Sequence, residues 1–105
     1  MALVIYCTCP DTSVASEIAE ALLEQRLAAC VNLLPNVQSI YRWQGRIERD
    51  DEVLLLIKSD ATRFEQLKKQ ILDLHPYELP EIIGVPVEAG YREYLRWITQ
   101  SLSDS

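Results

Sequence analysis

A run of five consecutive apolar residues, Val53-Leu54-Leu55-Leu56-Ile57, places the strongest constraint on how this chain can fold. The run closes a predicted strand from about residue 46 to 58, and because successive side chains of a strand point to opposite faces, both faces are apolar here. Helices of the same chain can cover one face. In a chain of only 105 residues the other face would meet water, so we expect a second subunit to cover it.

Hydrophobic periodicity elsewhere predicts strands and helices around this strand. Strands are expected at 2–8, 29–41, 46–58 and 81–88. A first helix should begin at one of residues 11–13 and end near residue 27, a second should span 60–74, and a short third should begin near residue 91. The first six elements follow the order of the split β-α-β, or ferredoxin-like, fold. The predicted class is therefore α+β. We expect one domain, residues 1–105, whose antiparallel sheet carries two helices on one face and which ends in an extra C-terminal helix.

Local signals indicate where these elements begin and end. The first helix has three neighbouring candidate caps, Asp11, Thr12 and Ser13. The stretch Thr62-Arg63-Phe64-Glu65 fits a capping box for the second helix. Pro76 disfavours helical geometry at His75, so that helix should stop there. Pro35 predicts a bulge or an edge position in the second strand, and the tail 101–105 is expected to fray.

Charge and cysteine content argue against several classes of function. The net charge of −6 argues against general binding to nucleic acid or anionic membranes, which requires clustered Lys and Arg. No apolar run approaches the ~20 residues that span a bilayer, and the start of the chain lacks the positive region of a signal peptide. The three cysteines are expected to be free thiols in a reducing cytoplasm. The sequence shows no Gly-rich phosphate loop, zinc-finger spacing or H-E-x-x-H motif. It also supplies no nucleophile–base pairing, so no enzyme is predicted.

Four segments together resemble the CutA family, the divalent-cation-tolerance proteins. They are Ala28-Ala29-Cys30-Val31-Asn32, Ser39-Ile40-Tyr41-Arg42-Trp43-Gln44-Gly45, His75-Pro76-Tyr77-Glu78 and Tyr94-Leu95-Arg96-Trp97-Ile98. The resemblance implies a ferredoxin-like homotrimer whose long second and third strands form an extended hairpin that pairs between subunits. It also implies tolerance of divalent cations, copper especially, without catalysis. The family's likeness in shape to PII-type signalling proteins leaves an alternative, a small-molecule sensor or protein-partner scaffold in which metal binding is incidental.

Cys7 and His75 are the metal ligands that the resemblance implies. Thiolate and imidazole also suit copper chemically. Some family members carry a second histidine beside the first, where this chain has Leu74. The competing interpretation makes His75 a helix-end residue that packs against Pro76 and Tyr77, and Cys7 a small hydrophobic residue.

The other two cysteines are interpreted differently. Cys9 lies two residues beyond Cys7, so both would share one face of a strand and could present two sulfurs to a soft ion such as Cu(I). A thiol close to a strand end is more often a small core residue, and this interpretation is favoured for Cys9. Cys30 follows Ala28-Ala29 into a strand and is interpreted as core.

Aromatic and charged residues offer a second kind of site. Four aromatic residues are candidates for a pocket, although such residues are more often core or interface anchors: Tyr41, Trp43, Tyr77 and Trp97. Four charged residues lie beside apolar strands and either face solvent or line a cleft between subunits: Glu52, Lys58, Glu78 and Glu81. A carboxylate or lysine in such a cleft could contact a metal or an anion.

Overall fold

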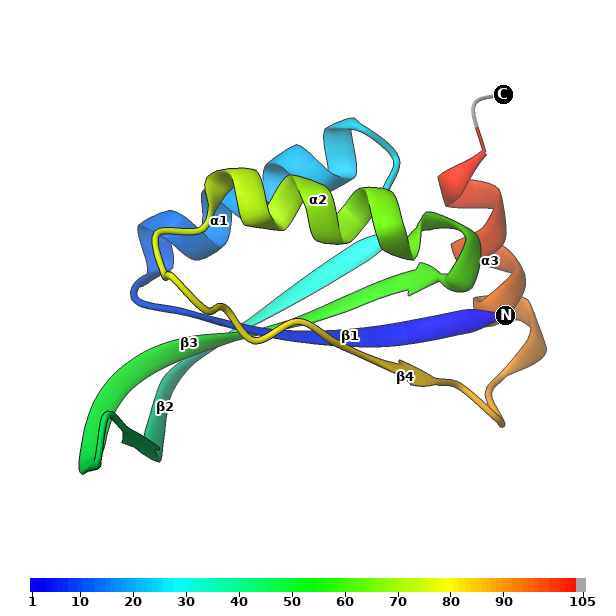
Figure 1. The fold of residues 1–105 in the computed structure, drawn as a ribbon. Coiled ribbons are helices and arrows are strands. Elements are labelled where there is room, and N and C mark those ends of the chain that lie inside the picture. The colour runs from blue at the N-terminus through cyan, green and yellow to red at the C-terminus, as the bar shows by residue number, and fades with distance from the viewer. Residues whose placement is uncertain (104–105) are drawn as a thin grey trace.

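The computed structural model describes residues 1–103, which form four strands, three α-helices and one 3₁₀ turn (Figure 1). The elements in chain order are β1 Ala2–Cys9, α1 Thr12–Glu24, β2 Cys30–Trp43, β3 Arg46–Asp60, η1 Ala61–Arg63, α2 Phe64–Leu74, β4 Ile83–Pro86 and α3 Arg92–Leu102. This is the element order that the periodicity predicts. The fourth strand is shorter than the predicted 81–88, and the second helix splits into η1 and α2.

The four strands form one antiparallel sheet in the order β2-β3-β1-β4. Helices α1 and α2 cover one face of it, as Figure 1 shows. Leu55 of β3 and Ile5 of β1 are fully buried beneath them, together with Ile18 of α1 and Ile71 of α2. The α+β ferredoxin-like class is thereby confirmed.

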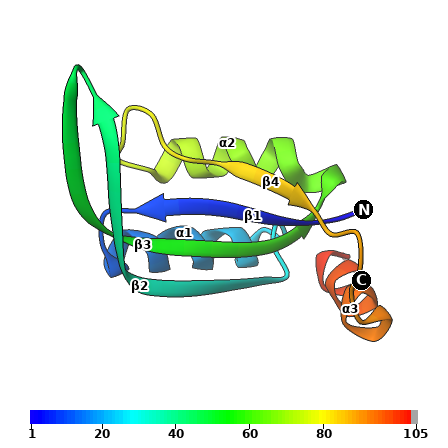
Figure 2. The ribbon, with the colours of Figure 1, turned by 90° about the horizontal axis from the view of Figure 1, so that it is seen from below.

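The opposite sheet face, which we call the open face, is apolar as well. Figure 2 turns it toward the viewer, with α1 and α2 behind the strands. Leu56 lies on this face opposite Tyr6 of β1, and Leu54 lies opposite Leu34 of β2. All four side chains are exposed or only half-buried, in contrast to fully buried Leu55. The structure thus confirms the two-sided apolar character of β3 that its sequence predicts.

Strands β2 and β3 continue past the end of β1 as a long hairpin. The pairing of β1 with β3 ends at Cys9 and Val53, whereas β2 and β3 stay paired to Trp43 and Arg46. Figures 1 and 2 show this hairpin curving out of the sheet. The predicted bulge is present as a register shift between Leu34 and Val37.

Two local predictions about the helix starts resolve differently. Asp11 is the cap of α1, because its side chain accepts a hydrogen bond of 2.9 Å from the backbone N–H of Val14. The capping box at 62–65 was wrong. Asp60, the last residue of β3, is the cap instead. Its side chain accepts from the backbone N–H groups of Thr62 and Arg63, so the 3₁₀ turn η1 begins directly after the strand. Aspartate is a strong N-cap residue, and Asp60 precedes Thr62 in the chain, so the helical turn already begins at Ala61.

The C-terminal helix is held at its end by two arginines from distant elements. Arg26 donates to the carbonyl of Ser101 over 3.0 Å, and Arg63 donates to the carbonyl of Leu102. Positively charged side chains stabilise the C-terminal end of a helix, where the last backbone carbonyls lack partners within the helix. Ser101 and Leu102 are therefore helical rather than frayed. Ser103 follows the helix and donates its backbone N–H to the carbonyl of Gln100 over 3.1 Å, whereas residues 104 and 105 of the predicted tail lie outside the described residues.

Arg63→Ala is expected to loosen α3 without changing the sheet. A hydrogen bond to a charged group contributes about 1.5–3 kcal/mol, and partial exposure places this one at the low end. Hydrogen exchange of the α3 amides should quicken by about tenfold or more, while β1 and β3 stay protected. Arg96→Ala is the matched control, because its contact with Glu93 is 3.8 Å long and exposed. Equal exchange in the two variants would show that Arg63 does not hold the helix.

Candidate metal centre and the adjoining hairpin pocket

Cys7, Cys9 and His75 meet in one buried cluster. Their sulfur and nitrogen atoms all lie within 4.8 Å of one another. Both cysteines are fully buried on the helix-facing side of β1, because positions two apart in a strand share a face. His75 follows the last residue of α2 with extended backbone angles, φ −78° and ψ 132°, as expected before a proline. Strand β1 and the residue after α2 thus bring two sulfur atoms and an imidazole together.

Both ring nitrogens of His75 make hydrogen bonds within the chain. Nδ1 accepts from the backbone N–H of Tyr77 over 3.1 Å, and Nε2 lies 2.8 Å from the carbonyl of Thr8. This pattern requires a neutral ring with its proton on Nε2. The ring also packs against Tyr77, with centroids 4.7 Å apart. These contacts match the helix-end interpretation, so a metal bound at this ring must replace one of the two hydrogen bonds.

The two thiols of the cluster influence each other. The hydrogen bond with Cys9, followed by burial, raises the pKa of Cys7. The same contact lowers the pKa of Cys9. Of the pair, Cys9 therefore gives up its proton first. All three cysteines are free thiols, as the sequence predicts.

Cys30 lies away from this cluster. It pairs with Lys58 on the open face and is only half-buried, so its interpretation as core was wrong. Tyr94 of α3 contacts it, and the pKa of Tyr94 is raised by burial and by this thiol. The physical reason is register: Val31, not Cys30, points toward the helices, opposite buried Ile57.

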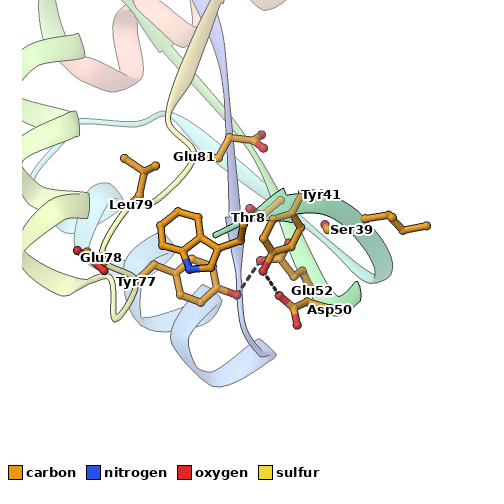
Figure 3. A pocket seen from close by; sticks show the side chains of 11 residues that line it. Thr8, Ser39, Tyr41, Asp50, Glu52, Tyr77, Glu78, Leu79 and Glu81 are labelled. Atoms are coloured by element: carbon orange, nitrogen blue, oxygen red, sulfur yellow. Dashed lines mark hydrogen bonds between the residues drawn. The ribbon is translucent and has the colours of Figure 1, made fainter. Parts of the chain in front are cut away.

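A cavity of about 540 Å³ lies beside the cluster, between the β2–β3 hairpin and the segment that joins α2 to β4. We call it the hairpin pocket. Its lining includes three aromatic and four acidic residues, most of them seen in Figure 3: Tyr41, Trp43, Tyr77, Asp50, Glu52, Glu78 and Glu81. Thr8, Ser39, Ile40 and Leu79 complete it. The structure thus brings together three of the four predicted aromatic residues and three of the four predicted charged ones.

Two phenol–carboxylate hydrogen bonds organise the pocket, and Figure 3 shows both. Tyr77 donates to Glu52 over 2.7 Å, and Tyr41 donates to Asp50. The bond to Asp50 raises the pKa of Tyr41 to about 12. Burial and then the bond to Glu52 raise the pKa of Tyr77. Both phenols therefore stay protonated at neutral pH and remain donors.

Two predicted residues lie elsewhere, and one lining residue was missed. Trp97 stacks on Tyr94 of the same helix, with ring centroids 5.6 Å apart. The ammonium group of Lys58 donates a hydrogen bond to the side-chain oxygen of Asn32. Neither residue lines the pocket. Asp50 was not predicted. Its alternation with Glu52 along β3, which puts both carboxylates on one face, was the signal available in the sequence.

The model of a family described as "CutA1 divalent ion tolerance protein" matches residues 3–101. The chain belongs to the CutA1 family. A divalent-cation tolerance protein CutA of Thermus thermophilus is 49% identical over 98 residues, which is 93% of this chain and 95% of that protein. A solved Thermus thermophilus structure of this kind is 50% identical with a TM-score of 0.91, covering 93% of this chain and 95% of that one.

Other CutA relatives differ in length and in description. Human Protein CutA is 50% identical over 103 residues, which is 95% of this chain but only 58% of the human protein. The CutA structure from Archaeoglobus fulgidus, 36% identical with a TM-score of 0.95, covers 98% of this chain and 100% of that one. That protein is described as periplasmic, so the cytoplasmic location expected for this CutA1 chain stays a prediction. No helix within residues 1–103 is long and apolar enough to cross a membrane.

The CutA1 family description names tolerance of divalent ions rather than a reaction. The Thermus thermophilus relative carries the same term in its name. The sequence resemblance to the family is confirmed.

Proposed function

We propose that this chain acts in divalent-cation tolerance by binding copper at the cluster of Cys7, Cys9 and His75, as a non-catalytic protein. One observation carries the proposal: two sulfurs and one imidazole nitrogen lie within 4.8 Å of one another. Sulfur and imidazole are ligands that soft copper prefers, whereas carboxylates suit harder ions. Burial of the cluster would also keep a bound ion away from water and from exchange with exposed thiols.

The donor set fits copper at a definite cost. One hydrogen bond of His75 must be given up, which costs about 0.5–1.5 kcal/mol. At least one thiol must lose its proton, and the lowered pKa of Cys9 makes it the first to do so. Three donors with two sulfurs favour Cu(I) over Cu(II), which prefers nitrogen and oxygen in a planar arrangement.

We also propose that the working form is a homotrimer. The open face supports this, because Leu54, Leu56 and Tyr6 leave apolar surface unburied in the single chain. Strand β2 is a sheet edge 14 residues long, and such an edge readily pairs with another chain. Ile40 and Ile47 on the projecting hairpin are 54% and 59% exposed, which adds apolar area outside the sheet.

Equilibrium dialysis of the metal-free chain against Cu(I), Cu(II) and Zn(II) tests the metal proposal. We expect about one Cu(I) per chain, held at least tenfold more tightly than Zn(II) or Cu(II). Cys30→Ser is the control and should retain the full stoichiometry, because Cys30 lies outside the cluster. Retention of all three ions with equal affinity, or of none, would contradict a soft-metal site.

The hairpin pocket favours a second candidate, the small-molecule sensor or partner scaffold. A cavity of about 540 Å³ lies within the range of about 300–1,000 Å³ that small ligands occupy. In that case metal binding would be incidental. Dialysis of the metal-free chain against nucleotides and small metabolites separates this candidate from the first, because only a sensor would retain such a molecule without copper.

A further inference from the structure

We propose that the hairpin pocket binds a small organic cation of the amine class. The pocket shares no residue with the cluster of Cys7, Cys9 and His75, so the proposal does not depend on copper binding. It rests on three properties of the described lining: its charge, a carboxylate on a nearly buried residue with a single hydrogen bond, and the aromatic rings beside that carboxylate.

The lining has charge of only one sign. Asp50, Glu52, Glu78 and Glu81 contribute four carboxylates, and no Lys, Arg or His among residues 1–103 lines the pocket. Within residues 1–103, the ion pairs join Lys68 to Glu65 on α2 and Arg96 to Glu93 on α3, and none of these four residues lines the pocket. An anionic ligand is therefore disfavoured, and a cation is attracted.

Among the four pocket carboxylates, Glu52 is the one on a buried residue, so it gains most from a positively charged partner. Its side chain belongs to a residue only 6% exposed, and the bond from the Tyr77 phenol is its one hydrogen bond within the described chain. A carboxylate has about four acceptor positions, and a neutral phenol fills one of them. A buried charge is costly unless a counter-charge and further donors accompany it. An ammonium group supplies both at once.

The aromatic residues distinguish an organic cation from a metal ion. Tyr41 and Tyr77 donate their hydroxyls to Asp50 and Glu52, so each carboxylate lies at the hydroxyl end of a ring, as Figure 3 shows. Trp43 adds a third ring to the lining. Ring faces attract ammonium groups and pack against a carbon chain. A hydrated divalent ion would use the carboxylates alone, and the rings would be irrelevant to it.

Calorimetric titration of the full chain, metal-free and in its native assembly, tests the proposal. The probes are 1,4-diaminobutane, its uncharged counterpart 1,4-butanediol, and Mg²⁺. We expect the diamine to bind at least tenfold more tightly than the diol. Equal binding of diamine and diol, or binding of Mg²⁺ alone, would overturn the proposal. So would no binding at all, the result expected if a neighbouring copy's side chain fills the pocket.

Variants assign the binding to the pocket. Glu52→Gln keeps the shape and the acceptor for Tyr77 but removes the charge, and should weaken diamine binding at least tenfold. Glu88→Gln is the control, an exposed carboxylate outside the lining, and should bind as the parent does. Should Glu52→Gln fail to fold, Glu81→Gln, an exposed member of the lining, takes its place. Trp43→Leu should weaken the diamine severalfold. Equal affinities in pocket and control variants would overturn the proposal.

Discussion

Leu55→Asp is expected to unfold the chain, whereas Leu56→Asp is expected to leave the fold intact and dissociate the assembly. Leu55 is fully buried beneath α1 and α2, so its replacement would place a carboxylate without a partner in the core. Such burial costs several kcal/mol, a large part of a typical stability of about 5–15 kcal/mol. Leu56 is half-buried on the open face, where its neighbour would be another copy rather than a helix.

Two measurements separate these outcomes. Far-UV circular dichroism should show loss of structure for Leu55→Asp and retention for Leu56→Asp. Sedimentation equilibrium at micromolar concentration should give three subunits for the parent and one for Leu56→Asp. Leu72→Asp is the matched control, because Leu72 is 51% exposed on α2. A folded three-subunit Leu56→Asp variant would mean that the open face is not the interface. A monomeric parent would contradict the proposed homotrimer.

Cys7→Ser and His75→Ala are each expected to weaken copper binding by at least about tenfold, ~1.4 kcal/mol, with the assembly unchanged. A hydroxyl is a poor ligand for a soft ion, and alanine offers none. Cys9→Ser should have an effect of the same size, because its sulfur lies within the same 4.8 Å cluster. Competition against a Cu(I) chelator of known affinity measures each change.

Cys30→Ser controls for the loss of a thiol as such, and sedimentation controls for loss of assembly. Unchanged copper affinity in the Cys7→Ser, His75→Ala double variant would remove the proposed site. Glu78 and the other pocket carboxylates would then be the remaining ligands for a divalent ion, without preference for copper. The family membership would stand, and the sensor or scaffold role would become the better proposal.

The fold was predictable because each of its elements has a local signature. The apolar run at 53–57 predicted a strand that is apolar on both faces, and Pro35 indicated a bulge near the one found between Leu34 and Val37. The start of α2 was harder to predict. The capping box at 62–65 and the cap at Asp60 are both valid local patterns, and the position where β3 ends decided between them.

The candidate sites were predictable only in part. The face shared by Cys7 and Cys9 follows from the period of a strand, but their meeting with His75 depends on the packing of α2 against β1. The hairpin pocket joins residues 41–52 to residues 77–81, and no local pattern encodes that approach. Its aromatic and acidic members were recognisable as candidates one by one. Their arrangement around a shared cavity came from the curvature of the hairpin.

X-ray absorption at the copper edge of the Cu(I)-loaded chain is the most direct test of the central claim, because it identifies the atoms bound to the metal. The cluster of Cys7, Cys9 and His75 predicts two sulfur neighbours and one imidazole nitrogen, with one sulfur lost in Cys7→Ser and the imidazole signal lost in His75→Ala. A spectrum with only oxygen and nitrogen neighbours, unchanged in these variants, would contradict copper binding at this cluster.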